Sequence, residues 1–234
     1  MSAILPLRLE EVSFSAGGRA IIERVSLALE AGPSTIILGA NGAGKSVLMR
    51  LMHGLLQPTA GRIAWSGEGA RRRQAMVFQR PVMLRRSALD NVAYGLAVRG
   101  VARGECQRRA REAIERVGLA HLSQRQGRVL SAGEQQRLAL ARAWALHPRV
   151  LFLDEPTASL DPAAAAAVER IVGEIHAGGT AIVVTTHHLG LARRVADEVV
   201  FLHQGRIAER TPSDAFFQSP RSHEGAAYLA GELP

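Results

Sequence analysis

Eight consecutive residues, Gly39 to Ser46, fit the pattern G-x-x-x-x-G-K-[ST], in which backbone amides wrap phosphate groups. Lys45 is the sole lysine of the chain, because 28 of the 29 Lys+Arg residues are arginine. A compact ammonium on a flexible stem can reach phosphate oxygens inside a loop where a planar guanidinium would be crowded. The segment therefore predicts a nucleoside triphosphate site, with Ser46 as a ligand of Mg²⁺.

The residues on either side of this loop predict the elements that position it. Thr35 to Leu38 form a short apolar run typical of a buried strand, and apolar residues recur at helical spacing after Ser46. A helix that begins at the loop adds partial positive charge where the phosphates lie. We expect the nucleotide to be bound by Gly39, Ala40, Asn41, Gly42, Ala43, Gly44, Lys45, Ser46 and Val47.

A second apolar run, Val150 to Leu153, ends in the carboxylates Asp154 and Glu155. Ligands collect at the carboxyl ends of strands in an open α/β sheet, so we expect these carboxylates beside the phosphate loop. Because side chains alternate along a strand, we assign Asp154 to Mg²⁺ and Glu155 to the general base that polarises water. A surface acidic turn before Pro156 is the alternative.

Ser131 and Glu134 have the spacing of a capping box at the start of a helix over residues 133–146. Alone, this pattern predicts only a well-capped helix. Together with Gln79, Asp161 and His187, in this order along the chain, it resembles the motifs of ATP-binding-cassette ATPases, whose signature is L-S-G-G-Q. The resemblance covers nearly the whole chain.

The resemblance implies hydrolysis of ATP with Mg²⁺ by two cassettes paired head to tail, here as a homodimer. Gln79 would join the Mg²⁺ shell and the attacking water, and His187 would contact the γ-phosphate. Asp161 would line the dimer seam. The signature helix of one chain would face the γ-phosphate bound by the other, through Ser131, Ala132, Gly133 and Glu134.

Four positions depart from the family pattern. Ala132 replaces a glycine, Glu134 replaces a glutamine, and His188 stands where many members have an acid. Ala16 takes the place of the aromatic residue that usually stacks on adenine, and Phe14 is expected in the core.

The order of predicted elements indicates an α/β fold: a P-loop cassette with a mostly parallel sheet, an N-terminal antiparallel β lobe and a helical subdomain. Predicted strands are Leu7 to Phe14, Ser26 to Leu29, Thr35 to Leu38, Arg62 to Trp65, Val150 to Leu153 and Ala181 to Thr185, and residues 87–130 are helical. We expect one cassette over residues 1–234, with a nucleotide-binding core and β lobe (1–80 and 148–210), a helical signature subdomain (81–147) and a tail (211–234).

Composition limits the class of protein. The 234 residues are 47% hydrophobic, enough for a sizeable core, yet no apolar stretch approaches the roughly 18 residues that span a bilayer. The first residues also lack the pattern of a signal peptide. We therefore expect a protein that is neither secreted nor membrane-spanning, and Cys106 is expected on a solvated helix face in a reducing cytoplasm.

The net charge of +8 comes from arginine clusters that are dispersed along the chain, and only 4% of residues are aromatic. Such a chain offers no stacking platform for nucleic acid, so we predict no nucleic-acid partner. Solvated faces and an anionic membrane surface account better for the charge.

The family that the chain resembles includes proteins of two functional classes, and the sequence has to be weighed against both. Members that act in repair or translation carry two cassettes or a long helical insertion, whereas a single cassette is typical of transport ATPases that work on separate permease subunits. A GTPase is disfavoured because its N-K-x-D motif needs a second lysine. We expect a peripheral protein on the cytoplasmic face of the inner membrane, with transmembrane permease subunits as partners and a solute-binding protein as an indirect one.

Residues 76–96 and 216–233 resemble ATPases of tungstate and phosphate importers. The resemblance implies import of a small anion such as tungstate, molybdate or phosphate, with an amino-acid importer or a small exporter as the alternative. Residues 79–94 are expected to dock a permease helix through Met83 and Leu84, which arginines flank. A covered satellite core is the alternative for these two residues.

Overall fold

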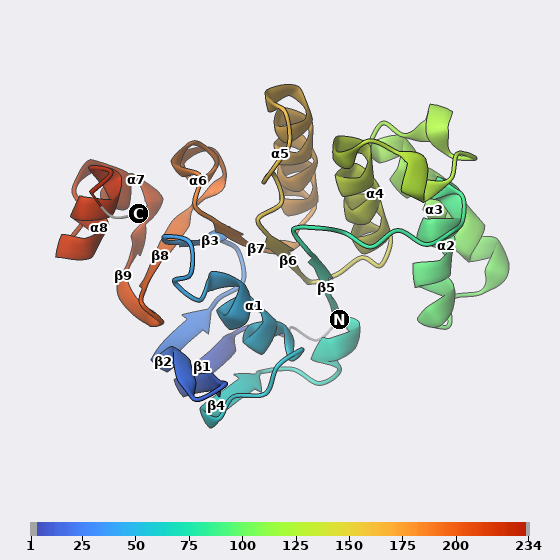
Figure 1. Ribbon diagram of the computed structural model, residues 1–234. Coiled ribbons are helices and arrows are strands. Elements are labelled where there is room, and N and C mark those ends of the chain that lie inside the picture. The colour runs from blue at the N-terminus through green and yellow to red at the C-terminus, as the bar shows by residue number, and fades with distance from the viewer. Residues whose placement is uncertain (1–3, 233–234) are drawn as a thin grey trace. The chain divides into compact units, whose positions relative to one another are not determined.

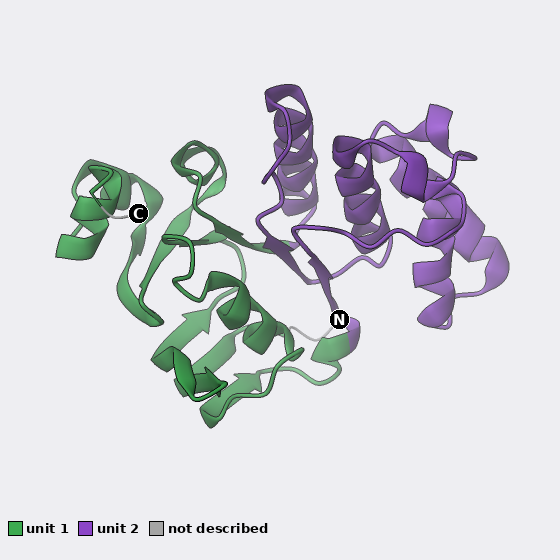
Figure 2. Cartoon of the chain, in the orientation of Figure 1, with its two compact units in different colours: residues 1–71, 181–234 green, residues 72–180 purple. Residues whose placement is uncertain are grey.

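The computed structural model describes residues 4–232, and the chain divides into two compact units. Unit 1 comprises Met1–Arg71 and Ala181–Pro234, and unit 2 comprises Arg72–Thr180 (Figure 2). The α/β fold class predicted from the sequence is confirmed, because antiparallel strands, parallel strands and helices all occur.

Unit 1 contains an antiparallel sheet with the strand order β2-β1-β4 (Figure 1). Leu7 of β1 (Leu7–Ala16) lies opposite Leu29 of β2 (Arg19–Leu29) on one side and opposite Trp65 of β4 (Ala60–Trp65) on the other. Leu7, Leu9 and Val12 of β1 are buried. Leu7 and Leu9 have the two-residue spacing of a strand face, and the register with β2 shifts between Leu9 and Val12. This is the predicted β lobe, with longer strands than the apolar runs alone indicated.

The second sheet of unit 1 runs in the order β7-β3-β8-β9. The strands β7 (Ala181–Thr186), β3 (Thr35–Leu38) and β8 (Glu198–His203) are parallel, and β9 (Arg206–Pro212) returns antiparallel to β8. All residues of β3 are buried, as expected for a parallel strand covered on both faces. The helices of unit 1 are α1 (Lys45–His53), α6 (Leu189–Val195), α7 (Ser213–Gln218) and α8 (His223–Leu229).

Unit 2 contains a parallel pair of strands, β5 (Gln74–Val77) and β6 (Val150–Asp154), together with its helices. Helix α4 contacts β5, α2, α3 and α5, so it lies at the centre of this unit's packing. The helices of unit 2 are α2 (Ala88–Val98), α3 (Arg103–Arg116), α4 (Ala132–Trp144) and α5 (Pro162–Ala177), and its short 3₁₀ turns are η2 (Ala120–Leu122) and η3 (Gly127–Val129). A further 3₁₀ turn, η1 (Ala70–Arg72), begins in unit 1, which ends in this part of the sequence at Arg71.

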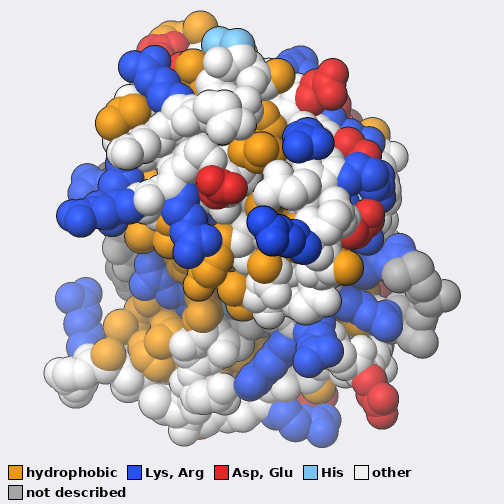
Figure 3. All heavy atoms as spheres, turned by 90° about the vertical axis from the view of Figure 1, so that its right-hand side faces the viewer, with side chains coloured by type: hydrophobic (Ala, Val, Ile, Leu, Met, Phe, Trp, Pro, Cys, Tyr) orange, Lys and Arg blue, Asp and Glu red, His pale blue; other side chains and the backbone are white. Residues whose placement is uncertain are grey.

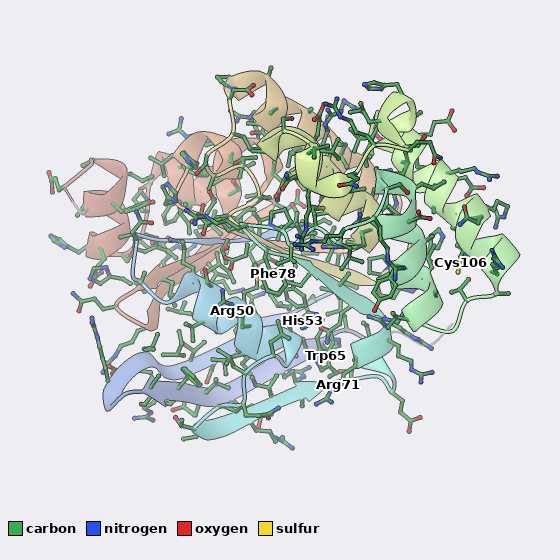
Figure 4. All side chains as sticks on the ribbon, turned by 45° about the vertical axis from the view of Figure 1, so that its right-hand side comes forward. Arg50, His53, Trp65, Arg71, Phe78 and Cys106 are labelled. Atoms are coloured by element: carbon green, nitrogen blue, oxygen red, sulfur yellow. The ribbon has the colours of Figure 1, made fainter. Side chains whose placement is uncertain are left out.

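Two side chains of unit 2 are more buried than their sequence patterns predicted. The expectation that Cys106 lies on a solvated face is wrong, because α3 turns this residue inward with Ala110 and Ile114, and its Sγ donates to the carbonyl oxygen of Val101 at 3.2 Å (Figure 4). Met83 is also not the exposed anchor of a docking surface: its exposed fraction is 5%, which agrees with the alternative of a covered satellite core, and Leu84 is half-buried. In both segments, charged neighbours in sequence do not reveal which side packs.

The surface carries many cations, and on the face shown in Figure 3 they do not form one continuous basic stripe. On the face shown in Figure 3, Lys and Arg side chains are spread among acidic, apolar and uncharged ones. Between residues 4 and 232, the helices lack the combination of length and apolar character that crossing a membrane requires.

Candidate nucleotide-binding site

The phosphate loop connects β3 to α1, as predicted from the sequence. Gly44 is the N-cap of α1 with φ 102°, a left-handed conformation that favours glycine. A Cβ atom at Gly44 would lie 2.9 Å from Cδ1 of Ile22 and 3.0 Å from the carbonyl oxygen of Ile21. A side chain here would therefore push the loop away from β2.

The other end of the loop is equally close to its surroundings. A Cβ atom at Gly39 would overlap the carbonyl oxygen of Leu202 on β8. The carbonyl oxygen of Ala43 accepts a hydrogen bond from the amide of Gly205 at 3.0 Å. The loop is thus held against β8 and the turn that follows it, before any ligand is considered.

The ammonium of Lys45 lies within the loop. Its Nζ donates to the carbonyl oxygens of Gly39 at 2.8 Å and Ala40 at 3.0 Å, and the residue is only 6% exposed. A buried cation needs oxygen partners, and phosphate oxygens are stronger acceptors than carbonyl oxygens. The loop therefore presents one positive charge together with the N-terminus of α1, both of which favour an anion.

His187 follows the strand beside the phosphate loop. Leu38 at the end of β3 pairs in parallel register with Thr186 at the end of β7, so Gly39 and His187 leave the same edge of the sheet. The imidazole is half-buried, and its ring centroid lies 4.2 Å from that of His188. The amide of His188 donates to Oγ1 of Thr186 at 3.0 Å, which shapes the turn after β7.

The carboxylates and Gln79 share an edge in unit 2. Val77 of β5 pairs with Leu153 of β6, so Gln79 and Asp154 stand at the carboxyl ends of adjacent parallel strands. Asp154 and Glu155 are buried, whereas Gln79 is exposed. The alternative of a surface acidic turn does not agree with this burial.

Glu155 is oriented by a turn and not by strand alternation. The strand β6 ends at Asp154, and Glu155 has φ 46°, in the left-handed region. The prediction that strand alternation directs Asp154 and Glu155 to different sides is therefore wrong, since alternation applies only within a strand. A non-glycine residue with a left-handed backbone costs on the order of 1 kcal/mol. Strained backbone conformations of this kind are typical of positions whose geometry serves a site.

The predicted capping box at Ser131 is present in full. The amide of Ser131 donates to Oε2 of Glu134 at 2.8 Å, and the amide of Glu134 donates to Oγ of Ser131 at 3.4 Å. The pKa of Glu134 is lowered by two hydrogen bonds, of which the one with the Ser131 backbone has the larger effect and the one with the Ser131 side chain the smaller. The glutamate therefore adds a negative charge to the start of α4, where the helix dipole stabilises it.

The sequence did not explain why position 133 is glycine. A Cβ atom there would lie 2.7 Å from Cβ of Ala164, so the missing side chain lets α4 approach α5 closely. Asp161 caps α5, accepting from the amide of Ala164 at 2.9 Å, which gives it a structural role of its own. The small residues near the starts of the two helices, Gly133 in α4 and Ala164 in α5, could have indicated this contact from the sequence.

The predicted residues thus form two groups, each within one unit. The phosphate loop and His187 belong to unit 1, and the signature, Gln79, the carboxylates and Asp161 belong to unit 2. Ala16 at the end of β1 is exposed, and Phe14 is half-buried and pairs with Ile22. Tyr228, whose hydroxyl donates to the carbonyl oxygen of His187, was missed because no local pattern marks it.

Comparison with known protein families identifies the family to which the chain with these two groups of residues belongs. The sequence profile of the ABC transporter family matches residues 22–158, more than half of the chain, including the loop, the signature and the acidic strand end. The chain belongs to the ABC transporter family. Within that family it is an ATPase that binds ATP, and the family resemblance noted in the sequence is confirmed.

Curated relatives of this ABC ATPase carry several different cargo names. The tungstate uptake system ATP-binding protein TupC of Peptoclostridium acidaminophilum is 40% identical over 87% of this chain and 95% of its own length. The phosphate import ATP-binding protein PstB 2 of Natronomonas pharaonis is 36% identical, covering 95% and 85%. The arginine/ornithine transport ATP-binding protein AotP of Pseudomonas aeruginosa is 34% identical, covering 97% and 98%.

Solved structures agree with the fold of this ABC ATPase. The cbiO1 protein of Clostridium perfringens, part of the transporter complex cbiONQ, has a TM-score of 0.82 at 28% identity, covering 93% of this chain and 92% of that one. The ATP-binding cassette MJ0796, a dimer in a post-hydrolysis state bound to ADP and Pi, has a TM-score of 0.79 at 25% identity, covering 88% and 98%.

Proposed function

We propose that this ABC ATPase energises a membrane importer for a small oxyanion such as tungstate, molybdate or phosphate. The observation that carries its ATPase chemistry is the buried Lys45 ammonium inside the loop at the N-terminus of α1, with His187 leaving the adjacent strand. The oxyanion assignment is supported by the tungstate and phosphate import relatives, which are 40% and 36% identical.

The proposed catalytic roles follow the chemistry of each side chain. Glu155 acts as the general base toward the attacking water, His187 contacts the γ-phosphate, and Gln79 links the water to the helical part of unit 2. The residues proposed to bind ATP are Gly39, Ala40, Asn41, Gly42, Ala43, Gly44, Lys45, Ser46 and Val47.

Mg²⁺ fits the donor set proposed for it. Ser46 lies in the first turn of α1 and Asp154 ends β6 as a buried carboxylate, while Gln79 supplies an amide oxygen. Hydroxyl, carboxylate and amide oxygens are ligands that Mg²⁺ accepts, and it commonly combines one or two carboxylates with substrate phosphates. When bound, the ion would neutralise charge on the phosphates.

We further propose that two copies of the chain pair head to tail as they bind ATP. Each copy would present its capped α4 start, from Ser131 to Glu134, toward the γ-phosphate on the other, with Asp161 at the seam. The dimeric MJ0796 structure supports the pairing of two cassettes, and the head-to-tail orientation is part of our proposal. Since the amide of Ser131 already donates to Glu134, the proposed contact uses the Ser131 hydroxyl and the amides that remain at the start of the helix.

The proposed permease contact lies on unit 2, around Val82. Val82 is 70% exposed, and Phe78 and Tyr94 are exposed large apolar residues of the same unit. Arg142 donates to the carbonyl oxygen of Val82 at 3.0 Å, and the guanidinium of Arg86 lies 4.6 Å from the Tyr94 ring centroid. Apolar side chains bordered by arginines suit a short permease helix with acidic or polar flanks. Met83, which is buried, serves the unit's own core.

A cysteine at position 82 is expected to crosslink to a cytoplasmic permease helix in the assembled transporter, because Val82 is the most exposed apolar residue of this surface. Crosslinking is detected by a mass shift of both subunits on a denaturing gel, after the cysteine is labelled with a photoactivatable thiol reagent and the transporter is illuminated. Leu55→Cys is the matched control, because Leu55 is a 51% exposed apolar residue that belongs to unit 1 and not to the proposed surface. Equal crosslinking from both positions contradicts the docking proposal.

The transported solute is tested on the complete transporter with its permease and solute-binding protein in membrane nanodiscs. We expect tungstate, molybdate or phosphate to stimulate ATP hydrolysis several-fold, because substrate loading favours the closed cassette dimer. Arginine at the same concentration is the comparison, since AotP acts in arginine/ornithine transport. Stimulation by arginine alone would make this an amino-acid importer. The proposed location is peripheral, at the cytoplasmic face of the inner membrane.

A further inference from the structure

The C-terminal tail reaches the backbone of His187. The hydroxyl of Tyr228 on α8 donates to the carbonyl oxygen of His187 at 2.9 Å, across 41 residues of sequence. The tyrosine is 9% exposed, so this hydrogen bond is largely shielded from water. A shielded hydrogen bond is costly to break because the carbonyl then loses a partner that water does not readily replace.

The Tyr228 ring is itself held in place by aromatic packing. Its centroid lies 5.2 Å from that of Phe201 on β8, and Phe201 lies 5.6 Å from Phe216 on α7. Phe201 and Phe216 are fully buried. The hydroxyl is therefore presented from a ring packed against β8, the strand that pairs with β3 next to β7.

The start of α8 is tied to β9 by Glu209. One carboxylate oxygen, Oε2, accepts from the amides of Arg221 at 2.9 Å and Ser222 at 2.8 Å and from the Ser222 hydroxyl at 2.9 Å. Burial acts to raise the pKa of Glu209, but these hydrogen bonds outweigh it and leave the pKa below its usual value. The ionised carboxylate thus anchors the helix that carries Tyr228 (Figure 1, red).

The tail also contacts the helix that follows His187. The guanidinium of Arg193 on α6 lies 4.9 Å from the ring centroid of Phe217 on α7. Since α6 begins at Leu189, the tail contacts the segment after β7 at both its beginning and its end. Arg193 and Phe217 hold the helix, and Tyr228 holds the peptide of His187.

We propose that Tyr228 is a positioning residue for His187. Its hydrogen bond fixes the peptide after His187, and backbone torsions determine which side-chain rotamers are open to a residue. The imidazole is thereby kept at the sheet edge that it shares with the phosphate loop. This inference rests on the γ-phosphate role proposed above for His187, and it gives a tail from which we propose no nucleotide ligand a part in catalysis.

The variant Tyr228→Phe removes the hydroxyl and keeps the ring that packs on Phe201. We expect kcat for ATP hydrolysis to fall about fivefold, equivalent to about 1 kcal/mol, because the imidazole is less often in position. KM for ATP is expected to change by less than about twofold, since the phosphate loop is untouched. Steady-state kinetics on the purified full chain measures both.

Thr180→Val is the matched control, because Thr180 is a buried residue whose hydroxyl also donates to a backbone carbonyl, that of Pro148 at 3.0 Å. Both variants should lose similar thermal stability, but Thr180→Val should keep its kcat. The inference is overturned if Tyr228→Phe keeps the wild-type kcat, or if both variants lose kcat equally.

Hydrogen exchange separates this inference from the role of His187. In Tyr228→Phe, amides in a peptide covering residues 184–190 should exchange faster than in the wild type or Thr180→Val. Unchanged exchange in that peptide contradicts the positioning role. His187→Ala tests the other half: if it retains wild-type turnover, the proposed γ-phosphate contact fails, while the exchange result still judges whether Tyr228 holds the peptide.

Discussion

Lys45→Arg is expected to abolish ATP hydrolysis although it conserves the positive charge. The Lys45 ammonium lies between the carbonyl oxygens of Gly39 and Ala40, at 2.8 and 3.0 Å, in a loop that packs closely on β2 and β8. A guanidinium is wider, planar and rigid, so it cannot occupy this place without displacing the amides that wrap the phosphates. Turnover is measured by phosphate release at saturating ATP and Mg²⁺.

Arg24→Lys is the matched control for the lysine exchange. Arg24 is an exposed residue of β2 in the same unit, where it pairs with Glu11 at 2.7 Å. Exposed ion pairs contribute little, so turnover should stay within about twofold of the wild type. If Lys45→Arg keeps more than about a tenth of wild-type turnover, a barrier change below about 1.4 kcal/mol, the proposed role of the ammonium is incorrect.

Glu155→Gln is expected to bind ATP and to lower hydrolysis by about 100-fold or more, because the amide keeps the shape of the side chain but cannot accept the proton. The wild-type glutamate is buried directly after β6, at φ 46°. Without hydrolysis, the ATP-bound pairing of two chains is not released. The variant should therefore run as a dimer with ATP and Mg²⁺ and as a monomer without them, as measured by light scattering.

Asp154→Asn distinguishes a metal ligand from a base. Loss of its charge should weaken binding of Mg²⁺ and hence of the triphosphate, so little ATP-dependent dimer is expected. Glu174→Gln, at an exposed site on α5 in the same unit, should hydrolyse ATP normally. The division of labour is wrong if Glu155→Gln hydrolyses ATP near the wild-type rate, or if the two site variants are indistinguishable in ATP binding and dimerisation.

Features that depend on near neighbours in the chain were predictable from the sequence. The phosphate loop, the start of α1 at Lys45 and the capping box from Ser131 to Glu134 occur where the motifs place them. Their hydrogen bonds join residues only a few positions apart, so the residue types and spacing specify them. The parallel strands β3, β6 and β7 were likewise predicted from short apolar runs, which strands buried on both faces require.

Features that depend on distant parts of the chain were decided only by the tertiary structure. The burial of Met83 and Cys106, and the left-handed turn at Glu155, follow from which neighbouring elements pack there, which local charge patterns do not encode. The register of β5 with β6 brings Gln79 and Asp154 to the same edge of the sheet, and that of β3 with β7 does the same for His187 and the phosphate loop. The sequence by itself determined the chemistry of the loop, its ammonium and the helix caps. Only tertiary packing decided what supports His187, because the hydrogen bond from Tyr228 joins residues that meet when α8 packs on β8 and β9.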